Sequence, residues 1–97
     1  MYARVTRYKF NAEGVSKITE INNEIEPQIM KIPGAKHWSS LMGEDGQAMV
    51  VVVYENEAAA TAAIDTVKGL WGSVMQYLDG PPEAPEVYNV YGLKTEL

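Results

Sequence analysis

Hydrophobic and polar positions follow two different periods along the chain. Four segments have the length of strands and are rich in β-branched and aromatic residues, namely residues 2–10, 35–42, 48–54 and 86–91. Residues 14–32 and 57–78 instead repeat apolar residues every three or four positions, which indicates an amphipathic helix in each. The pattern therefore predicts the element order strand, helix, strand, strand, helix, strand.

Short polar and glycine-containing signals mark the ends of these elements. Asn11 and Asn56 stand where the two helices begin, and asparagine is a preferred N-cap residue. Pro27 lies inside the first helix and is expected to kink it or to end its regular part. Asp45-Gly46, between the second and third strands, is typical of a tight hairpin turn, so these two strands should be antiparallel neighbours.

Two successive strand–helix–strand units with right-handed crossovers build a ferredoxin-like βαββαβ fold of the α+β class. In this arrangement both helices cover one face of a four-stranded antiparallel sheet, which suits the single apolar stripe of each helix. The 97 residues contain no repeat, no low-complexity tract and no internal boundary. We therefore expect one domain spanning residues 1–97.

The third strand is apolar on both of its faces, and this bears on the oligomeric state. Alternate residues of a strand point to opposite faces of the sheet. One set here is Ala48, Val50, Val52 and Tyr54, and the other is Met49, Val51 and Val53. Because the helices can cover only one set, the other face should pack against a second copy of the chain. The sequence predicts a homodimer and leaves open which set forms its interface.

Composition argues against several classes of function. The formal net charge of −5 disfavours nucleic-acid binding, which depends on clustered lysine and arginine. No apolar window approaches the ~20 residues needed to cross a membrane, so a cytoplasmic location is the default expectation. With no cysteine, one histidine and no glycine-rich phosphate-binding loop, we expect neither a bound metal nor any other cofactor.

His37 is the candidate for catalysis, because it is the only histidine and imidazole exchanges protons near neutral pH. It could act as a general base that removes a phenolic or enolic proton from a substrate. The alternative is a strand residue at a rim or an interface. Trp38 points to the opposite face of the sheet, so only one of the two can line a given surface.

Arg4 is the most suggestive candidate for ligand binding, since a charged side chain on a largely apolar sheet face needs a partner. That partner could be a carboxylate or enolate of a ligand, or an acidic residue of a second subunit. Aromatic and hydroxyl side chains suit the same pocket, although each could equally be packing. The predicted ligand-binding residues are Arg4, Thr6, Tyr8, Trp38, Tyr54, Trp71 and Tyr88.

The order of several features resembles the antibiotic biosynthesis monooxygenase-like (ABM) domains, a group within the dimeric α+β barrel proteins. The similar features are Pro27 late in the first helix, Pro33-Gly34 before the second strand, Tyr54-Glu55 before an alanine-rich helix, and a proline-rich approach to the last strand. The resemblance covers nearly the whole chain. It implies a homodimer with a ligand cavity, either between each sheet and its own helices or inside the barrel between the two sheets.

The resemblance also bears on the activity. Members include cofactor-independent oxygenases of aromatic polyketides and haem-degrading enzymes. Many members carry a histidine early in the second helix, where this chain has only alanine and threonine from Ala58 to Ala63. Haem-degrading relatives use an asparagine on the first strand, a tryptophan on the second helix and a histidine soon after it. Trp71 could match the tryptophan, but no histidine follows His37, so haem degradation is disfavoured.

The function implied in this way is a cofactor-independent monooxygenase or a related small-molecule enzyme that acts on an apolar or aromatic compound. The alternative is a non-catalytic dimeric module that binds a ligand or has a structural role. A cavity in the interior would favour the first function, and an interior filled by its own side chains would favour the second.

Overall fold

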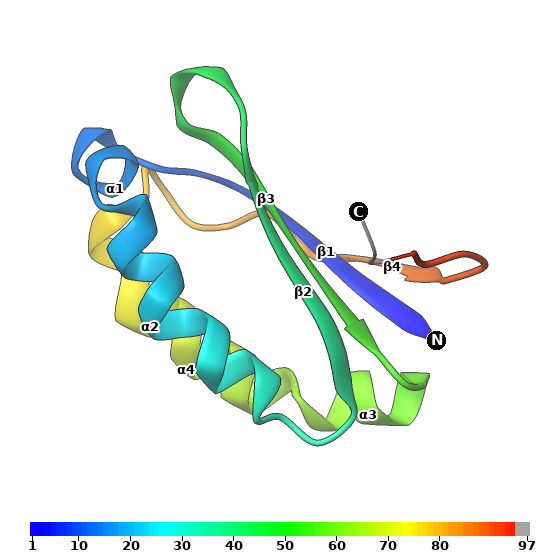
Figure 1. Cartoon of the computed structure of the whole chain (residues 1–97). Helices are drawn as coiled ribbons and strands as arrows, with labels where there is room; N and C mark the ends of the chain where they lie inside the picture. Colours follow the sequence, from blue (N-terminus) through cyan, green and yellow to red (C-terminus); the bar gives the residue numbers. More distant parts are fainter. Residues whose placement is uncertain (95–97) are drawn as a thin grey trace.

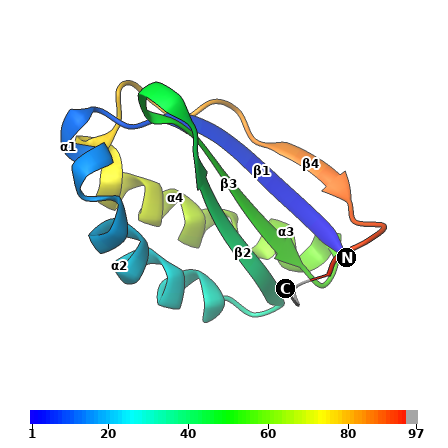
Figure 2. The same cartoon turned by 45° about the horizontal axis from the view of Figure 1, so that its top comes forward.

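Two long strands form the middle of a four-stranded antiparallel sheet with the strand order β2-β3-β1-β4. The computed structural model describes residues 1–94, and its strands are β1 (Tyr2–Lys9), β2 (Ala35–Met42), β3 (Gln47–Tyr54) and β4 (Glu86–Asn89). The helices all lie on one side of this sheet (Figures 1 and 2). The predicted ferredoxin-like α+β fold is confirmed, and all four predicted strands are present.

The helical layer has more breaks than the sequence predicted. The first predicted helix is divided into α1 (Ala12–Ser16) and α2 (Ile18–Met30), and the second into α3 (Glu57–Ala62), α4 (Ile64–Val74) and the 3₁₀ turn η2 (Met75–Tyr77). The first break falls at Lys17, where φ is −107° and ψ is 12°. The two predicted helical segments are therefore present, but their breaks fall at Lys17 and Ala63 rather than at Pro27. None of the helices in residues 1–94 has the length and apolar composition that a membrane span requires.

Both predicted N-caps are present. The Asn11 side chain accepts a hydrogen bond from the Gly14 amide at 2.8 Å and donates one to the Gln76 carbonyl at 2.8 Å, so it joins α1 to η2. The Asn56 side chain accepts from the Ala59 amide at 2.8 Å at the start of α3. Each cap satisfies a backbone donor that the first helical turn leaves free.

The hairpin between β2 and β3 is also confirmed. Its turn contains the 3₁₀ segment η1 (Glu44–Gly46), in which Asp45 has a φ of 57° and Gly46 a φ of 77°. Positive φ is the region that glycine and, to a lesser degree, aspartate adopt most easily. The Asp45-Gly46 dipeptide thus reverses the chain and fixes the register of the two strands.

The register of the sheet decides which side chains face the helices. Opposite pairs in β1 and β3 include Arg4 with Val52 and Thr6 with Val50, and these side chains lie on the helix-covered face, here called the inner face. β2 contains a bulge between Ala35 and His37, after which Trp38 is opposite Val52. Trp38 therefore belongs to the inner face. His37, opposite the buried Val53, belongs to the outer face, which the helices do not cover.

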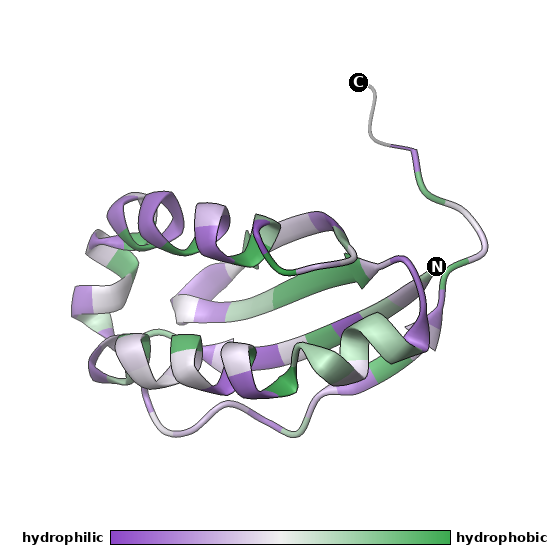
Figure 3. Ribbon diagram, turned by 90° about the horizontal axis from the view of Figure 1, so that it is seen from below, coloured by the Kyte–Doolittle hydropathy of each residue, from purple (hydrophilic) through white to green (hydrophobic). Residues whose placement is uncertain are grey.

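The core lies between the inner face and the helices, and it consists of two groups of buried side chains. The first group surrounds Tyr54 and includes Ile29, Ile32, Val52, Ala60 and Ala63. The second comprises Tyr8, Phe10, Ile21, Ala48 and Leu78. Figure 3 shows hydrophobic stretches along the strands and hydrophilic residues over much of α2, whereas α3 is largely hydrophobic. Two side chains, Ile25 and Val50, contact both groups.

Candidate ligand-binding site

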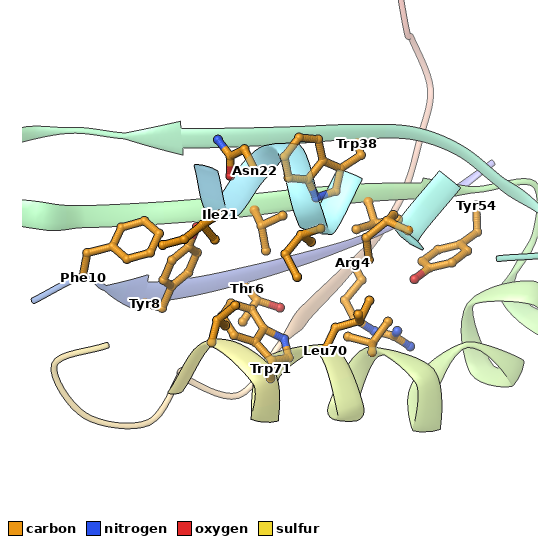
Figure 4. A pocket seen from close by; sticks show the side chains of 16 residues that line it. Arg4, Thr6, Tyr8, Phe10, Ile21, Asn22, Trp38, Tyr54, Leu70 and Trp71 are labelled. Carbon is orange, nitrogen blue, oxygen red and sulfur yellow. The ribbon is translucent and has the colours of Figure 1, made fainter. Parts of the chain in front are cut away.

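A cavity of about 70 Å³ lies between the inner face and the helices, partly open to the surface. Its walls come from both core groups, so the two groups pack around this space rather than filling it (Figure 4). The sixteen lining residues are Arg4, Thr6, Tyr8, Phe10, Ile21, Asn22, Ile25, Ile29, Trp38, Val50, Val52, Tyr54, Val67, Leu70, Trp71 and Val74.

One end of the cavity is aromatic. The ring of Tyr8 meets that of Phe10 edge-on, with 5.1 Å between ring centres, and that of Trp71 edge-on at 4.9 Å. Edge-to-face contacts of this kind hold flat rings in fixed orientations. Burial raises the pKa of the Tyr8 hydroxyl, and the nearby Ser40 side chain offsets part of the rise. Tyr8 is therefore a neutral phenol at physiological pH.

The other end carries Arg4, the one charged side chain among the sixteen lining residues. Arg4, from the central strand β1, donates a hydrogen bond from Nη2 to the Ala60 carbonyl at 2.9 Å. Its guanidinium carbon lies 5.7 Å from the centre of the Tyr54 ring, within the range of a cation–π contact. Figure 4 shows the Tyr54 hydroxyl and the Trp38 ring nitrogen directed toward the interior from two further strands.

Two of these polar atoms are buried without a hydrogen-bond partner. Within residues 1–94, neither Trp38 Nε1 nor Tyr54 Oη has an acceptor or donor at hydrogen-bond distance and angle. A buried donor left in this way costs about 1–3 kcal/mol, so natural proteins rarely keep one without a reason. Burial also raises the pKa of Tyr54, and the neighbouring Arg4 guanidinium, through its charge and its N–H groups, offsets part of that rise, although no contact between the two side chains has the geometry of a hydrogen bond.

The chemistry available to the cavity follows from its donors. Its lining includes two neutral phenols, a guanidinium, an amide and two indoles, and none of the sixteen lining residues is a carboxylate or a histidine. Such a set can hold an electron-rich or negatively charged oxygen. It offers no side chain that would take up a proton near neutral pH. The lining thus has groups that can stabilise charge on a bound molecule and none suited to abstract a proton.

The structure brings most of the predicted ligand-binding residues together. Six of them line the cavity: Arg4, Thr6, Tyr8, Trp38, Tyr54 and Trp71. Tyr88 does not, since it lies on β4, is 52% exposed and donates its hydroxyl to Glu86 at 2.7 Å. This contact lowers the pKa of the Glu86 carboxyl and raises that of the Tyr88 hydroxyl.

The predicted catalytic residue also lies away from the cavity. His37 is on the outer face, and its Nε2 is 2.6 Å from Ser39 Oγ, two residues along the same strand. A ligand held between the sheet and the helices of the same subunit is therefore out of its reach, because the sheet separates them.

Sequence reasoning did not single out Asn22, the one amide among the lining residues. A signal was present, since the apolar stripe of the first helix could be continued by either Ile21 or Asn22. Both residues reach the cavity from α2 (Figure 4). The periodicity of the helices and strands predicts that the apolar lining residues are buried. It does not indicate that they form the walls of a cavity. Residues 1–94 contain no group of three or more histidine, aspartate or glutamate side chains placed to hold a metal ion.

Comparison with known proteins identifies the fold. No protein-family model matches this chain, and no curated protein matches it in sequence. SnoaB, a cofactor-independent oxygenase from Streptomyces nogalater, is similar in structure, with a TM-score of 0.75. The match covers 98% of this chain and 97% of the SnoaB chain, and the two sequences are 11% identical. The monooxygenase ActVA-Orf6 of Streptomyces coelicolor, solved with the ligand nanaomycin D, has a TM-score of 0.71, covering 99% and 92% at 19% identity.

A third similar structure, a protein of unknown function from Nitrosomonas europaea, has a TM-score of 0.79 and covers 99% of this chain and 94% of its own at 16% identity. The chain thus has the ABM-like α+β fold, and the resemblance seen in the sequence is confirmed at the level of the fold. The same fold supports oxygenases and proteins of unknown function, so the activity has to be argued from the site.

Proposed function

We propose that the protein binds a small, flat, largely apolar compound between its sheet and its helices, and that it acts on this compound as a cofactor-independent, monooxygenase-like enzyme. The observation that carries the proposal is the cavity, which combines aromatic and aliphatic walls with a few polar groups. The fold neighbours support the reaction class, since SnoaB is a cofactor-independent oxygenase and ActVA-Orf6 was solved with nanaomycin D.

The lining of the cavity suits a reaction in which the substrate provides the electrons. An electron-rich aromatic compound with an acidic methylene group can react with O2 through its own anion. One oxygen atom then enters as a carbonyl, and the other leaves as water with the two hydrogen atoms of that carbon. The protein would stabilise the anion through Arg4 and the buried donors while the apolar walls exclude water.

The proposal is tested by measuring O2 consumption with an anthrone as substrate. We expect one O2 to disappear for each carbonyl formed, with no added metal, flavin or nicotinamide. Val67, on α4, lines the cavity, so Val67→Phe should fill it and reduce the rate at least ~10-fold. Ile64→Phe is the matched control, because Ile64 is on the same helix, is 36% exposed and does not line the cavity.

A second candidate function is binding without catalysis. It is favoured by one observation: no lining residue is a histidine or a carboxylate that could start the reaction as a base. Saturable binding of the anthrone, combined with O2 consumption no faster than in buffer, would select this function over the oxygenase.

We further propose that the protein works as a homodimer joined through the outer face. The centre of this face is apolar, with Val51 opposite Val5 and Met49 opposite Leu41, and polar side chains such as Arg7, His37 and Ser39 surround it. An apolar centre with a polar rim is the usual anatomy of a protein interface. The single-domain organisation and the cytoplasmic location stay predictions from the sequence.

A further inference from the structure

Arg4, Trp38 and Tyr54 each bring a hydrogen-bond donor to the wall of the cavity. Tyr54 is fully buried at 0% exposure, and neither its hydroxyl nor Trp38 Nε1 has a hydrogen-bond partner within residues 1–94. Arg4 lies beside the Tyr54 ring and gives one N–H to the Ala60 carbonyl. A guanidinium has five N–H groups, so Arg4 keeps further donors for another acceptor.

Among the described residues, Arg4 has no ion-pair partner. Within residues 1–94, the ion pairs join Arg7 to Glu86, Lys9 to Asp79, Lys17 to Glu13 and Lys36 to Glu55, and Arg4 takes part in none of them. An acidic residue of a second subunit is a poor candidate, because Arg4 faces the helices of its own chain and the proposed dimer contact is on the other side of the sheet. A partly buried cation beside unpaired donors is a feature of anion-binding sites.

We propose that this end of the cavity binds the carboxylate of a small, flat organic acid, whose apolar body extends toward the aromatic end formed by Tyr8, Phe10 and Trp71. The inference rests on the proposed ligand-binding function and adds the chemical class of the ligand. A carboxylate has about four lone-pair positions, enough to accept from Arg4, Trp38 and Tyr54 together. Charge-assisted bonds of this kind are stronger where the surroundings are apolar.

The size of the cavity sets the size of the acid. Its volume of about 70 Å³ is roughly half of the ~150 Å³ that holds a benzene ring in an enclosed protein cavity. Because this cavity is partly open, one ring can enter with its carboxylate first, and the further rings of a larger compound such as an anthrone would lie at the opening. The net charge of −5 disfavours unspecific attraction of anions, so tight anion binding would have to come from this local site.

The test compares benzoate with benzamide, which has nearly the same shape and no charge. Both tryptophans of the chain, Trp38 and Trp71, line the cavity, so their fluorescence reports binding directly. At neutral pH we expect benzoate to bind at least about 10-fold more tightly than benzamide, the difference expected for a hydrogen-bonded charge. Benzoate should also raise the Tm more than benzamide does at equal concentration.

Substitutions of Arg4 and Tyr54 test whether the preference for benzoate arises at these two residues. Arg4→Gln should remove the preference for benzoate, and Arg4→Lys should keep part of it. Tyr54→Phe should weaken benzoate binding about 10-fold while the Tm of the free protein stays equal or rises, because the variant loses only an unpaired buried hydroxyl. If Tyr54 served only to support the fold, its substitution would not weaken benzoate binding while leaving the Tm equal or higher. Tyr91→Phe is the control, since Tyr91 is 95% exposed.

The outcomes separate the inference from the function on which it rests. Benzamide binding as tightly as benzoate, or benzoate affinity unchanged in both Arg4→Gln and Tyr54→Phe, would overturn the carboxylate site and leave ligand binding intact. If neither compound changes the fluorescence or the Tm of the folded protein at millimolar concentration, both the carboxylate site and the small-ligand function are wrong. Should Arg4→Gln fail to fold, the Tyr54→Phe result decides alone.

Discussion

Tyr54 is the residue at which the stability of the fold and the chemistry of the site meet, and its ionisation gives a prediction. Burial raises its pKa above the usual value of about 10, so in alkaline solution the unfolded chain loses this proton before the folded protein does. The unfolded state then binds fewer protons, and stability falls as the pH rises above about 10. In Tyr54→Phe this contribution is absent, so the free energy of unfolding should fall less steeply with rising pH. The difference in slope should correspond to at most one bound proton.

Urea unfolding between pH 9 and pH 11 measures this slope. Tyr91→Phe, at an exposed position, should keep the slope of the original protein. Tyr8, whose pKa burial also raises, contributes to the slope in all three proteins and cancels in the comparison. Equal slopes in the two variants would contradict the prediction.

His37 provides a second prediction at the residue scale. Because it lies on the outer face and bonds to Ser39, His37→Ala should leave binding of a ligand in the cavity unchanged within about twofold, as measured by tryptophan fluorescence. A rate of O2 consumption that falls at least ~10-fold in this variant, with the dimer intact, would instead restore the sequence-based prediction that His37 is the general base.

The identity of the pocket residues was only partly predictable from the sequence, and β2 shows why. Strand alternation establishes that His37 and Trp38 point to opposite faces, but it does not say which of them faces the helices. That choice follows from the register with β3, which the turn at Asp45-Gly46 fixes and which puts Trp38 opposite Val52 on the inner face. Arg4, Thr6 and Tyr8 were easier to group because they alternate regularly along one strand.

At the scale of single elements, the caps should be worth measurable stability. Asn56 accepts the Ala59 amide at the start of α3, the helix whose Ala60 carbonyl receives Arg4. Asn56→Ala removes the cap and should lower the free energy of unfolding by about 1 kcal/mol, as urea denaturation would show. Asn56→Asp keeps an acceptor oxygen and should recover most of the loss. Equal destabilisation by both substitutions would show that the cap is not the cause.

The number and type of elements followed from periodicity, whereas the helix breaks did not. Apolar spacing across residues 57–78 is continuous, yet the structure separates α3 from α4 at Ala63, where the backbone is φ −81° and ψ −11°. Ala63 is buried at 2% exposure, so the break depends on packing rather than on a helix-breaking residue. Pro27, by contrast, is a recognised helix breaker but lies within α2, which continues to Met30.

At the scale of the whole molecule, the cavity depends on how the layers are joined. α1 and η2 are held together at one end by Asn11, and α3 contacts β1 through Arg4 at the other. Between these two points the helices and the sheet surround the space lined by Ile25, Val50 and Leu70. No local sequence pattern encodes such a space, because it arises from the distance at which separately predicted elements pack. The sequence could therefore predict the layers but not the cavity between them.

The outer face gives the last prediction, which concerns the assembly. Val51 lies at its centre, opposite Val5 on one side and Ser39 on the other, and it is only half-buried in a single chain. If two outer faces pack together, Val51→Asp places a carboxylate in a desolvated interface and should shift the protein from dimer to monomer. Sedimentation at micromolar concentration measures the change, against a monomer mass of 10.7 kDa. Val15→Asp, at a 39% exposed position on α1, should leave the dimer intact. A folded original protein that sediments as a monomer would contradict the homodimer, and the apolar centre of the outer face would then need a different partner.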